Sequence, residues 1–241
     1  MTAEAKQNRD VTLPEGVSLR RVAQVLLDAW EADPRRWMNA PVELREDPSR
    51  SAGMPVPQDA LDLFRLLAER HVDYLLVGGM AMLTYVMGRN TKDVDLLLSL
   101  EAAHKIPELE IRDQQDFFAR AQFRSLQVDL LFTFNPLFKA VAEKFATVHS
   151  FAELNVPAAT VEGLIVLKLY ALPSLYRQFD MDRAALYEND ITTLIAKYSP
   201  ELDRLVVLAS KEMEPGDKDE LKKIISECSE RAKLLRQRTG H

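Results

Sequence analysis

The stretch "VGGMAMLTYVMGRNTKDVDLLL", residues 77–98, decides how the fold of this chain is interpreted. An apolar run that predicts a strand ends at Gly78 and Gly79, "MAMLTYVM" then predicts a short helix, and "DVDLLLSL" predicts a second strand. Successive side chains of a strand point to opposite faces, so Asp93 and Asp95 share one face. Neighbouring carboxylates repel each other and are costly to bury unpaired, so we expect positive charge between them.

A third acid lies in another apolar run, "LQVDLLF", where Asp129 is flanked by valine and leucine. If this strand lies beside the strand that carries Asp93 and Asp95, three carboxylates meet on one face of a sheet. Such a cluster suits two hard divalent cations, Mg²⁺ with Mn²⁺ as the substitute, and paired cations of this kind promote phosphoryl transfer. The alternative is that the two strand aspartates are solvated residues on an exposed face.

The glycine pair also has two interpretations. Gly78 and Gly79 separate a strand from a helix, where missing side chains let a phosphate approach backbone N–H groups. A tight strand-to-helix turn without a ligand is the better explanation of a lone glycine pair.

The glycine pair, thirteen intervening residues and the D-V-D triplet together resemble the signature of the nucleotidyltransferase superfamily with the DNA polymerase β-like fold. The resemblance covers roughly residues 57–135, and Asp129 matches its third carboxylate. Many members have Gly-Ser where this chain has Gly78-Gly79, which leaves the serine hydroxyl contact to phosphate open.

"GRNTKDVDLLL" is further similar to the minimal nucleotidyltransferases related to AbiEii-type toxins of bacterial toxin–antitoxin systems. This resemblance implies that Arg89 and Thr91 lie beside the nucleotide; a polar turn before a strand is the alternative. The same relatives carry a lysine followed roughly twenty residues later by an aspartate, which Lys168 and Asp190 match.

Lys168 is the only charged residue of "LIVLKLYAL". Its ammonium either extends to the surface along an apolar stem or points into a cleft, where it would meet a triphosphate as a point charge.

The organisation of the chain predicts an α+β fold. Residues 1–56 form an N-terminal extension and linker with a helix expected at 18–32, residues 57–156 form the nucleotidyltransferase core of a small mixed sheet with helices, and residues 157–241 form a helical C-terminal domain. Two strands at 117–134 are expected to form a hairpin, and Thr160 is expected to cap the first helix of the C-terminal part.

Composition narrows the function classes. The net charge of −6 over 241 residues gives no basic footprint for gripping long nucleic acid, although a local basic cleft is compatible with it. One cysteine, Cys228, excludes an intramolecular disulfide and a cysteine-rich zinc site. The start lacks a signal peptide, and no apolar run approaches the ~20 residues that span a bilayer, so we expect a cytoplasmic location without a membrane partner.

The sequence therefore predicts an Mg²⁺-dependent enzyme that transfers a nucleoside monophosphate from an NTP to an acceptor hydroxyl. The resemblance favours a tRNA 3′ end as acceptor and implies an antitoxin partner. Transfer to a protein or a small molecule stays open, as does a non-catalytic regulatory protein that only binds nucleotides. In the resemblance Asp93 and Asp95 hold the metals, Asp129 completes the inner metal and helps to deprotonate the acceptor, Gly78 and Gly79 cradle phosphates, and Lys168 neutralises charge on the leaving pyrophosphate.

Overall fold

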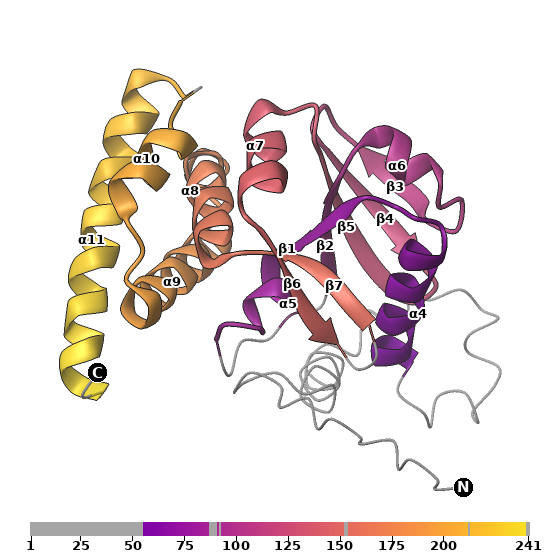
Figure 1. Cartoon of the computed structure of the whole chain (residues 1–241). Helices are drawn as coiled ribbons and strands as arrows, with labels where there is room; N and C mark the ends of the chain where they lie inside the picture. The colour runs from indigo at the N-terminus through magenta and orange to yellow at the C-terminus, as the bar shows by residue number, and fades with distance from the viewer. Residues whose placement is uncertain (1–54, 87–90, 92, 152–153, 212, 240–241) are drawn as a thin grey trace, which may run out of the picture.

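The computed structural model describes residues 55–86, 91, 93–151, 154–211 and 213–239 (Figure 1). The predicted helix at 18–32 lies outside the described residues, as does nearly all of the N-terminal extension. The chain forms one mixed sheet covered by helices, followed by helices alone, which confirms the predicted α+β class.

The sheet has seven strands in the order β3-β4-β5-β2-β1-β7-β6. Their bounds are β1 Tyr74–Val77, β2 Asp93–Leu98, β3 Glu110–Gln114, β4 Phe118–Phe123, β5 Leu126–Phe132, β6 Ala146–Phe151 and β7 Leu154–Ala159. β2 runs parallel to β5, and β1 runs parallel to β7, whereas the other pairs are antiparallel. The hairpin predicted at 117–134 is confirmed as β4 and β5.

The centre of the sheet is apolar on one face and carries the acids on the other. Val94 pairs with Val128, and Leu96 pairs with Leu130, and all four side chains are buried. Because strand side chains alternate, Asp93, Asp95 and Asp129 lie on the opposite face. The register of β2 with β5 therefore fixes where the carboxylates meet.

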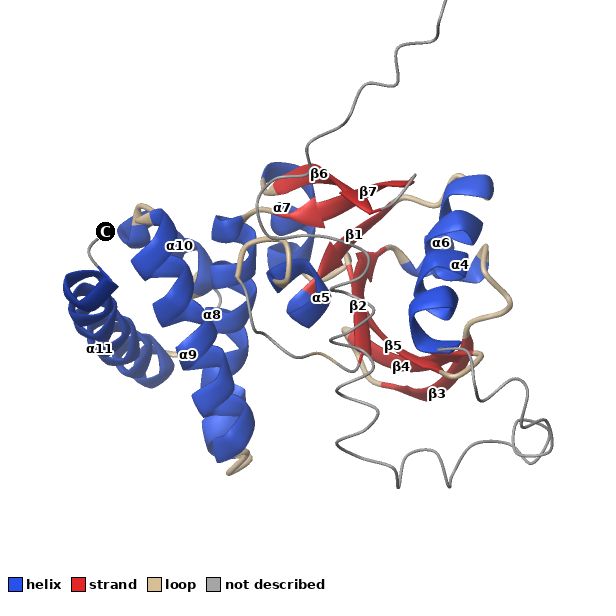
Figure 2. Ribbon diagram, turned by 90° about the horizontal axis from the view of Figure 1, so that it is seen from below, coloured by secondary structure: helices blue, strands red, loops and turns tan. Residues whose placement is uncertain are grey.

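Helices cover both faces of the sheet (Figure 2). α4 (Pro55–Glu69) and α6 (Leu100–His104) lie on the apolar side, and α5 (Gly78–Met82) and α7 (Pro136–Lys144) lie on the other side. α5 is shorter than the sequence predicts, because residues 83–85 continue as turns with hydrogen bonds to the third preceding residue. The carbonyl of Tyr85 instead accepts hydrogen bonds from Lys197 Nζ at 2.8 Å and the Tyr198 hydroxyl at 2.9 Å.

The helical half begins directly after β7. It contains α8 (Val161–Arg177), α9 (Met181–Tyr198), α10 (Leu202–Ala209) and α11 (Pro215–Thr239). Thr160 caps α8 as predicted, with its side chain accepting a hydrogen bond from the N–H of Gly163 at 3.3 Å. The sheet ends at Ala159, three residues beyond the predicted boundary at 156. None of the helices within the described ranges is long and apolar enough to cross a membrane.

Candidate active site

The strand acids meet in the parallel pair of β2 and β5. Asp95 lies directly opposite Asp129, and Asp93 lies opposite Gln127 in the same register. The Gln127 amide donates to Asp129 Oδ1 at 3.1 Å and reaches Asp93 Oδ2 at 3.5 Å. The strand adjacency that the sequence left conditional is therefore present, and the three acids lie on one face.

The glycine turn is shaped by these acids. Gly78 has φ +62°, and a Cβ there would lie 1.9 Å from Asp95 Oδ2. The N–H of Gly79 donates to Asp95 Oδ2 at 3.3 Å. A Cβ on Gly79 would lie 2.3 Å from Oγ1 of Thr91, which itself donates to the Asp93 carbonyl at 3.2 Å. The glycines thus let the turn approach Asp95 and Thr91, and their predicted contact with phosphate stays a prediction.

Charge at this site is poorly compensated. Burial, reinforced by the charges of Asp93 and Asp129, raises the pKa of Asp95 to about 7, with Lys168 and the Gly79 N–H opposing the shift. Burial also raises the pKa of Asp129, whose carboxylate is 1% exposed. Its Oδ1 pairs with Arg120 Nε at 3.3 Å, while its buried Oδ2 has no hydrogen-bond partner. An unpartnered buried carboxylate oxygen is costly unless a cation or donor reaches it.

The opposite side of the site comes from α8 and α9. Lys168 forms an ion pair with Asp190 Oδ2 at 2.8 Å, and the two side chains are only 5% and 2% exposed. The same ammonium lies 4.2 Å from the ring centroid of Tyr187. The surface-extended alternative for Lys168 is therefore wrong: its ammonium is held inside the protein.

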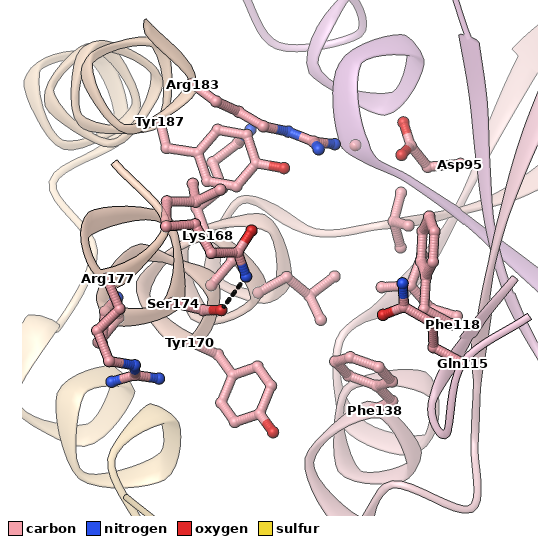
Figure 3. Close-up of a pocket in the computed structure, with 18 of the residues that line it drawn as sticks. Asp95, Gln115, Phe118, Phe138, Lys168, Tyr170, Ser174, Arg177, Arg183 and Tyr187 are labelled. Carbon is pink, nitrogen blue, oxygen red and sulfur yellow. Dashed lines mark hydrogen bonds between the residues drawn. The ribbon is translucent and has the colours of Figure 1, made fainter. Parts of the chain in front are cut away.

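A pocket of about 680 Å³ lies between the sheet and these helices (Figure 3). Asp95 and Arg120 line its sheet side, and Lys168, Arg183 and Tyr187 line its helix side. Phe118, Phe138 and Tyr170 add an aromatic wall, and Arg177, which pairs with Asp217 at 2.7 Å, lies farther from Asp95. Carboxylates, cations and aromatic rings thus line one cavity.

The structure brings most of the predicted site residues together. Gly78, Asp95 and Lys168 line the pocket, and Asp93, Asp129, Gly79 and Thr91 adjoin Asp95 through strand register or contacts of the turn. Asp190 lies behind Lys168 as its ion-pair partner and does not line the pocket. Arg89 lies outside the described residues.

Sequence reasoning did not single out Arg120, Arg183 or Tyr187. Arg120 lies opposite Asp129 in the β4–β5 pairing, so the hairpin register, once fixed by its turn, places the two on one face. Tyr187 and Arg183 are one helical turn apart on α9 and precede Asp190, but only the packing of α9 against α8 turns them toward the pocket.

The three strand acids are candidates for a metal site. Carboxylate oxygens are the donors that Mg²⁺ prefers. A bound cation would give Asp129 Oδ2 the partner that it lacks and would lower the raised pKa of Asp95. Within the described residues, however, no three His, Cys, Asp or Glu side chains are gathered closely enough to hold an ion. The donor chemistry fits a divalent cation, whereas the present rotamers direct Asp129 toward Arg120.

Comparison with known proteins gives likeness of fold only. No protein-family model matches the sequence, and no curated protein matches it. One similar solved structure is an antigenic nucleotidyltransferase-like protein from Paracoccidioides brasiliensis, at 16% identity and a TM-score of 0.40, covering 66% of this chain and 88% of that one. Another is the antibiotic-resistance factor ANT(2″)-Ia, at 15% identity and a TM-score of 0.41, covering 78% of this chain and all of that one. At these values the function has to be argued from the site.

Proposed function

We propose that this protein is a metal-dependent nucleotidyltransferase that moves a nucleoside monophosphate from an NTP to an acceptor hydroxyl and releases pyrophosphate. The observation that carries the proposal is the parallel register of Asp95 with Asp129, with Asp93 on the same face. These acids adjoin a pocket whose opposite side carries the cations Lys168 and Arg183. Acids on one side and cations on the other suit a polyphosphate held between metal ions and basic side chains.

The reaction forms a bond between the acceptor oxygen and the α-phosphorus. The bond from that phosphorus to the oxygen bridging to the β-phosphate breaks, and this oxygen leaves with the electron pair as part of pyrophosphate. Asp129 is the proposed acceptor of the hydroxyl proton.

Asp93, Asp95 and Asp129 would hold two Mg²⁺ ions, or Mn²⁺ in their place. When bound, these ions would supply Lewis-acid stabilisation of charge on the reacting phosphate oxygens. Binding requires Asp129 to exchange its contact with Arg120 for the cation, and Arg120, which is 46% exposed and lines the pocket, can move into solvent or toward a phosphate.

The residues around the acids complete the proposed site. Gly78 and Gly79 would let phosphates approach the backbone, and Arg89 and Thr91 would lie beside the nucleotide. From the helical half, Lys168, paired with Asp190, would add positive charge near the phosphates, and its charge already opposes the raised pKa of Asp95. We also propose, from the resemblance in sequence, that a tRNA 3′ end is the acceptor and that the protein acts as the toxin of a toxin–antitoxin pair.

The test measures pyrophosphate release from each of the four NTPs, with Mg²⁺, with Mn²⁺ and with EDTA, in the presence of total RNA and cell lysate as acceptors. Asp93→Asn and Asp95→Asn should each reduce turnover about a thousandfold, which corresponds to ~4 kcal/mol of lost transition-state stabilisation. Binding of an NTP without turnover under every condition would instead support the non-catalytic regulatory function. Normal turnover by both variants would refute the metal assignment.

A further inference from the structure

Three cations, Lys168, Arg177 and Arg183, line the helix side of the pocket, and Arg177 is paired with Asp217. The ammonium of Lys168 is 2.8 Å from a carboxylate oxygen of Asp190 and 4.2 Å from the ring centroid of Tyr187. Both members of this ion pair are almost fully buried. Its charge is therefore largely compensated inside the protein, and breaking the pair to reach a ligand would separate two opposite charges in the interior.

Arg183 is the third cation. Within the described part of the chain, no carboxylate lies within ion-pair distance of its guanidinium. The guanidinium carbon lies 5.9 Å from the ring centroid of Tyr187. Its side chain extends across the pocket toward Asp95 (Figure 3). Burial opposes its charge, but Tyr187 and the negative charges of Asp95 and Asp129 outweigh burial and raise its pKa.

The base of Arg183 is well fixed. It lies in the first turn of α9, and its backbone N–H donates to the capping carboxylate of Asp180 at 3.2 Å. Tyr187 lies one helical turn further along and contacts Lys168 through its ring face. The Asp190–Lys168–Tyr187 contacts thus set the surface along which the arginine side chain extends.

We propose that Arg183 binds the phosphates of the NTP, and that Lys168 and Tyr187 act on the substrate through it, as positioning residues. A planar guanidinium matches phosphate oxygens with two parallel hydrogen bonds, which an ammonium cannot do. A polyphosphate between Asp95 and Arg183 would place its metal-binding oxygens toward the sheet and its remaining charge toward α9. This inference rests on the proposed function and names the residue that recognises its substrate.

The test compares Arg183→Gln and Arg183→Lys with the unchanged protein. Loss of a charge-assisted contact should weaken NTP binding about ten- to a hundredfold, seen as a higher KM with a smaller change in kcat. Arg183→Lys keeps the positive charge but lacks the planar guanidinium, so its loss of NTP binding should be smaller than that of Arg183→Gln but still measurable. Arg204→Gln is the matched control, because Arg204 is an exposed arginine of α10 paired with Glu201 at 3.3 Å.

Binding of inorganic tripolyphosphate, followed by calorimetry, gives a second measurement that needs no acceptor and no turnover. Tripolyphosphate should bind the unchanged protein and the Arg204→Gln control equally, and Arg183→Gln at least about tenfold more weakly. An active protein whose KM for NTP and affinity for tripolyphosphate are unaffected by both Arg183 substitutions overturns the Arg183 assignment alone. A protein that neither turns over NTP nor binds tripolyphosphate overturns the proposed function and this inference together. Thermal melting of each variant shows whether a loss reflects unfolding.

Discussion

Replacing Asp95 by asparagine should make the metal-free protein more stable, and more so at high pH. Folding raises the pKa of this carboxyl from 3.8 to about 7, because it is buried and lies beside Asp93 and Asp129. An acid with a raised pKa binds its proton more tightly when folded, so its ionisation costs stability as pH rises from the unfolded pKa to the folded one. Below pH 4 the cost is absent, and above pH 7 it is complete.

The size of the effect follows from the two pKa values. Between pH 5 and pH 8, ionisation of Asp95 should remove roughly 2.6 kcal/mol from the free energy of unfolding. The asparagine side chain of the variant does not ionise, and its amide oxygen can still accept from the Gly79 N–H that now donates to Asp95 Oδ2. The advantage of the variant over the unchanged protein should therefore grow by about that amount across this range, or about 5–10 °C in Tm.

Urea unfolding of both proteins in EDTA, at pH 5 and at pH 8, measures this difference. Asp113→Asn is the matched control, because Asp113 is an exposed carboxylate on β3 that also lines the pocket. Its effect should be small at both pH values. If the gain in free energy of unfolding from Asp95→Asn is equal at pH 5 and pH 8, or falls with pH, the ionised carboxylate of Asp95 does not destabilise the folded protein. Adding Mg²⁺ at pH 8 should stabilise the unchanged protein more than the variant.

Three further predictions concern the glycine turn, the buried ion pair on the helix side of the pocket, and the acceptor. Gly78→Ala should destabilise the protein by at least ~2 kcal/mol and abolish activity, because the new Cβ would lie 1.9 Å from Asp95 Oδ2 and the residue has a left-handed backbone conformation. The control is Gly216→Ala, which has open space around the Cβ and should leave unfolding by urea nearly unchanged. Equal effects of the two substitutions would show that the turn does not need a glycine at position 78. Lys168→Met should lower the free energy of unfolding by ~3–5 kcal/mol, because it removes the cation that pairs with the buried carboxylate of Asp190. Lys168→Met combined with Asp190→Leu should recover much of that loss, and a cost below ~1 kcal/mol for the single variant would show that the pair is not a coupled buried unit. Incubation with each labelled NTP, total tRNA and lysate should label the tRNA band. Salt should inhibit this labelling strongly if lysines and arginines contact phosphates. If only protein bands are labelled, and tRNA is unlabelled with all four nucleotides, tRNA is not the acceptor, although nucleotidyl transfer itself is supported.

Local sequence patterns predicted the elements that build the sheet side of the site. Apolar runs with period two predicted β2 and β5, and an oxygen-bearing residue before a helical pattern predicted the Thr160 cap. β3 was not predicted, because all of its residues are exposed and "EIRDQ" has no apolar face to reveal an edge strand. α6 was not predicted either, because its five residues follow β2 directly and carry little periodicity.

The sequence by itself determined which acids would share a face, because alternation along a strand depends only on spacing: Asp93 with Asp95 follows from period two alone. Which strands are neighbours depends on long-range packing, so only the tertiary structure decided that Asp129 lies opposite Asp95 and that Arg120 reaches it from the hairpin. The same holds for the helical wall. A lysine in an apolar helix is compatible with an ammonium at the surface or in the interior. The packing of α9 holds it in the interior, because α9 brings Asp190 to Lys168. The same packing directs Arg183 toward Asp95.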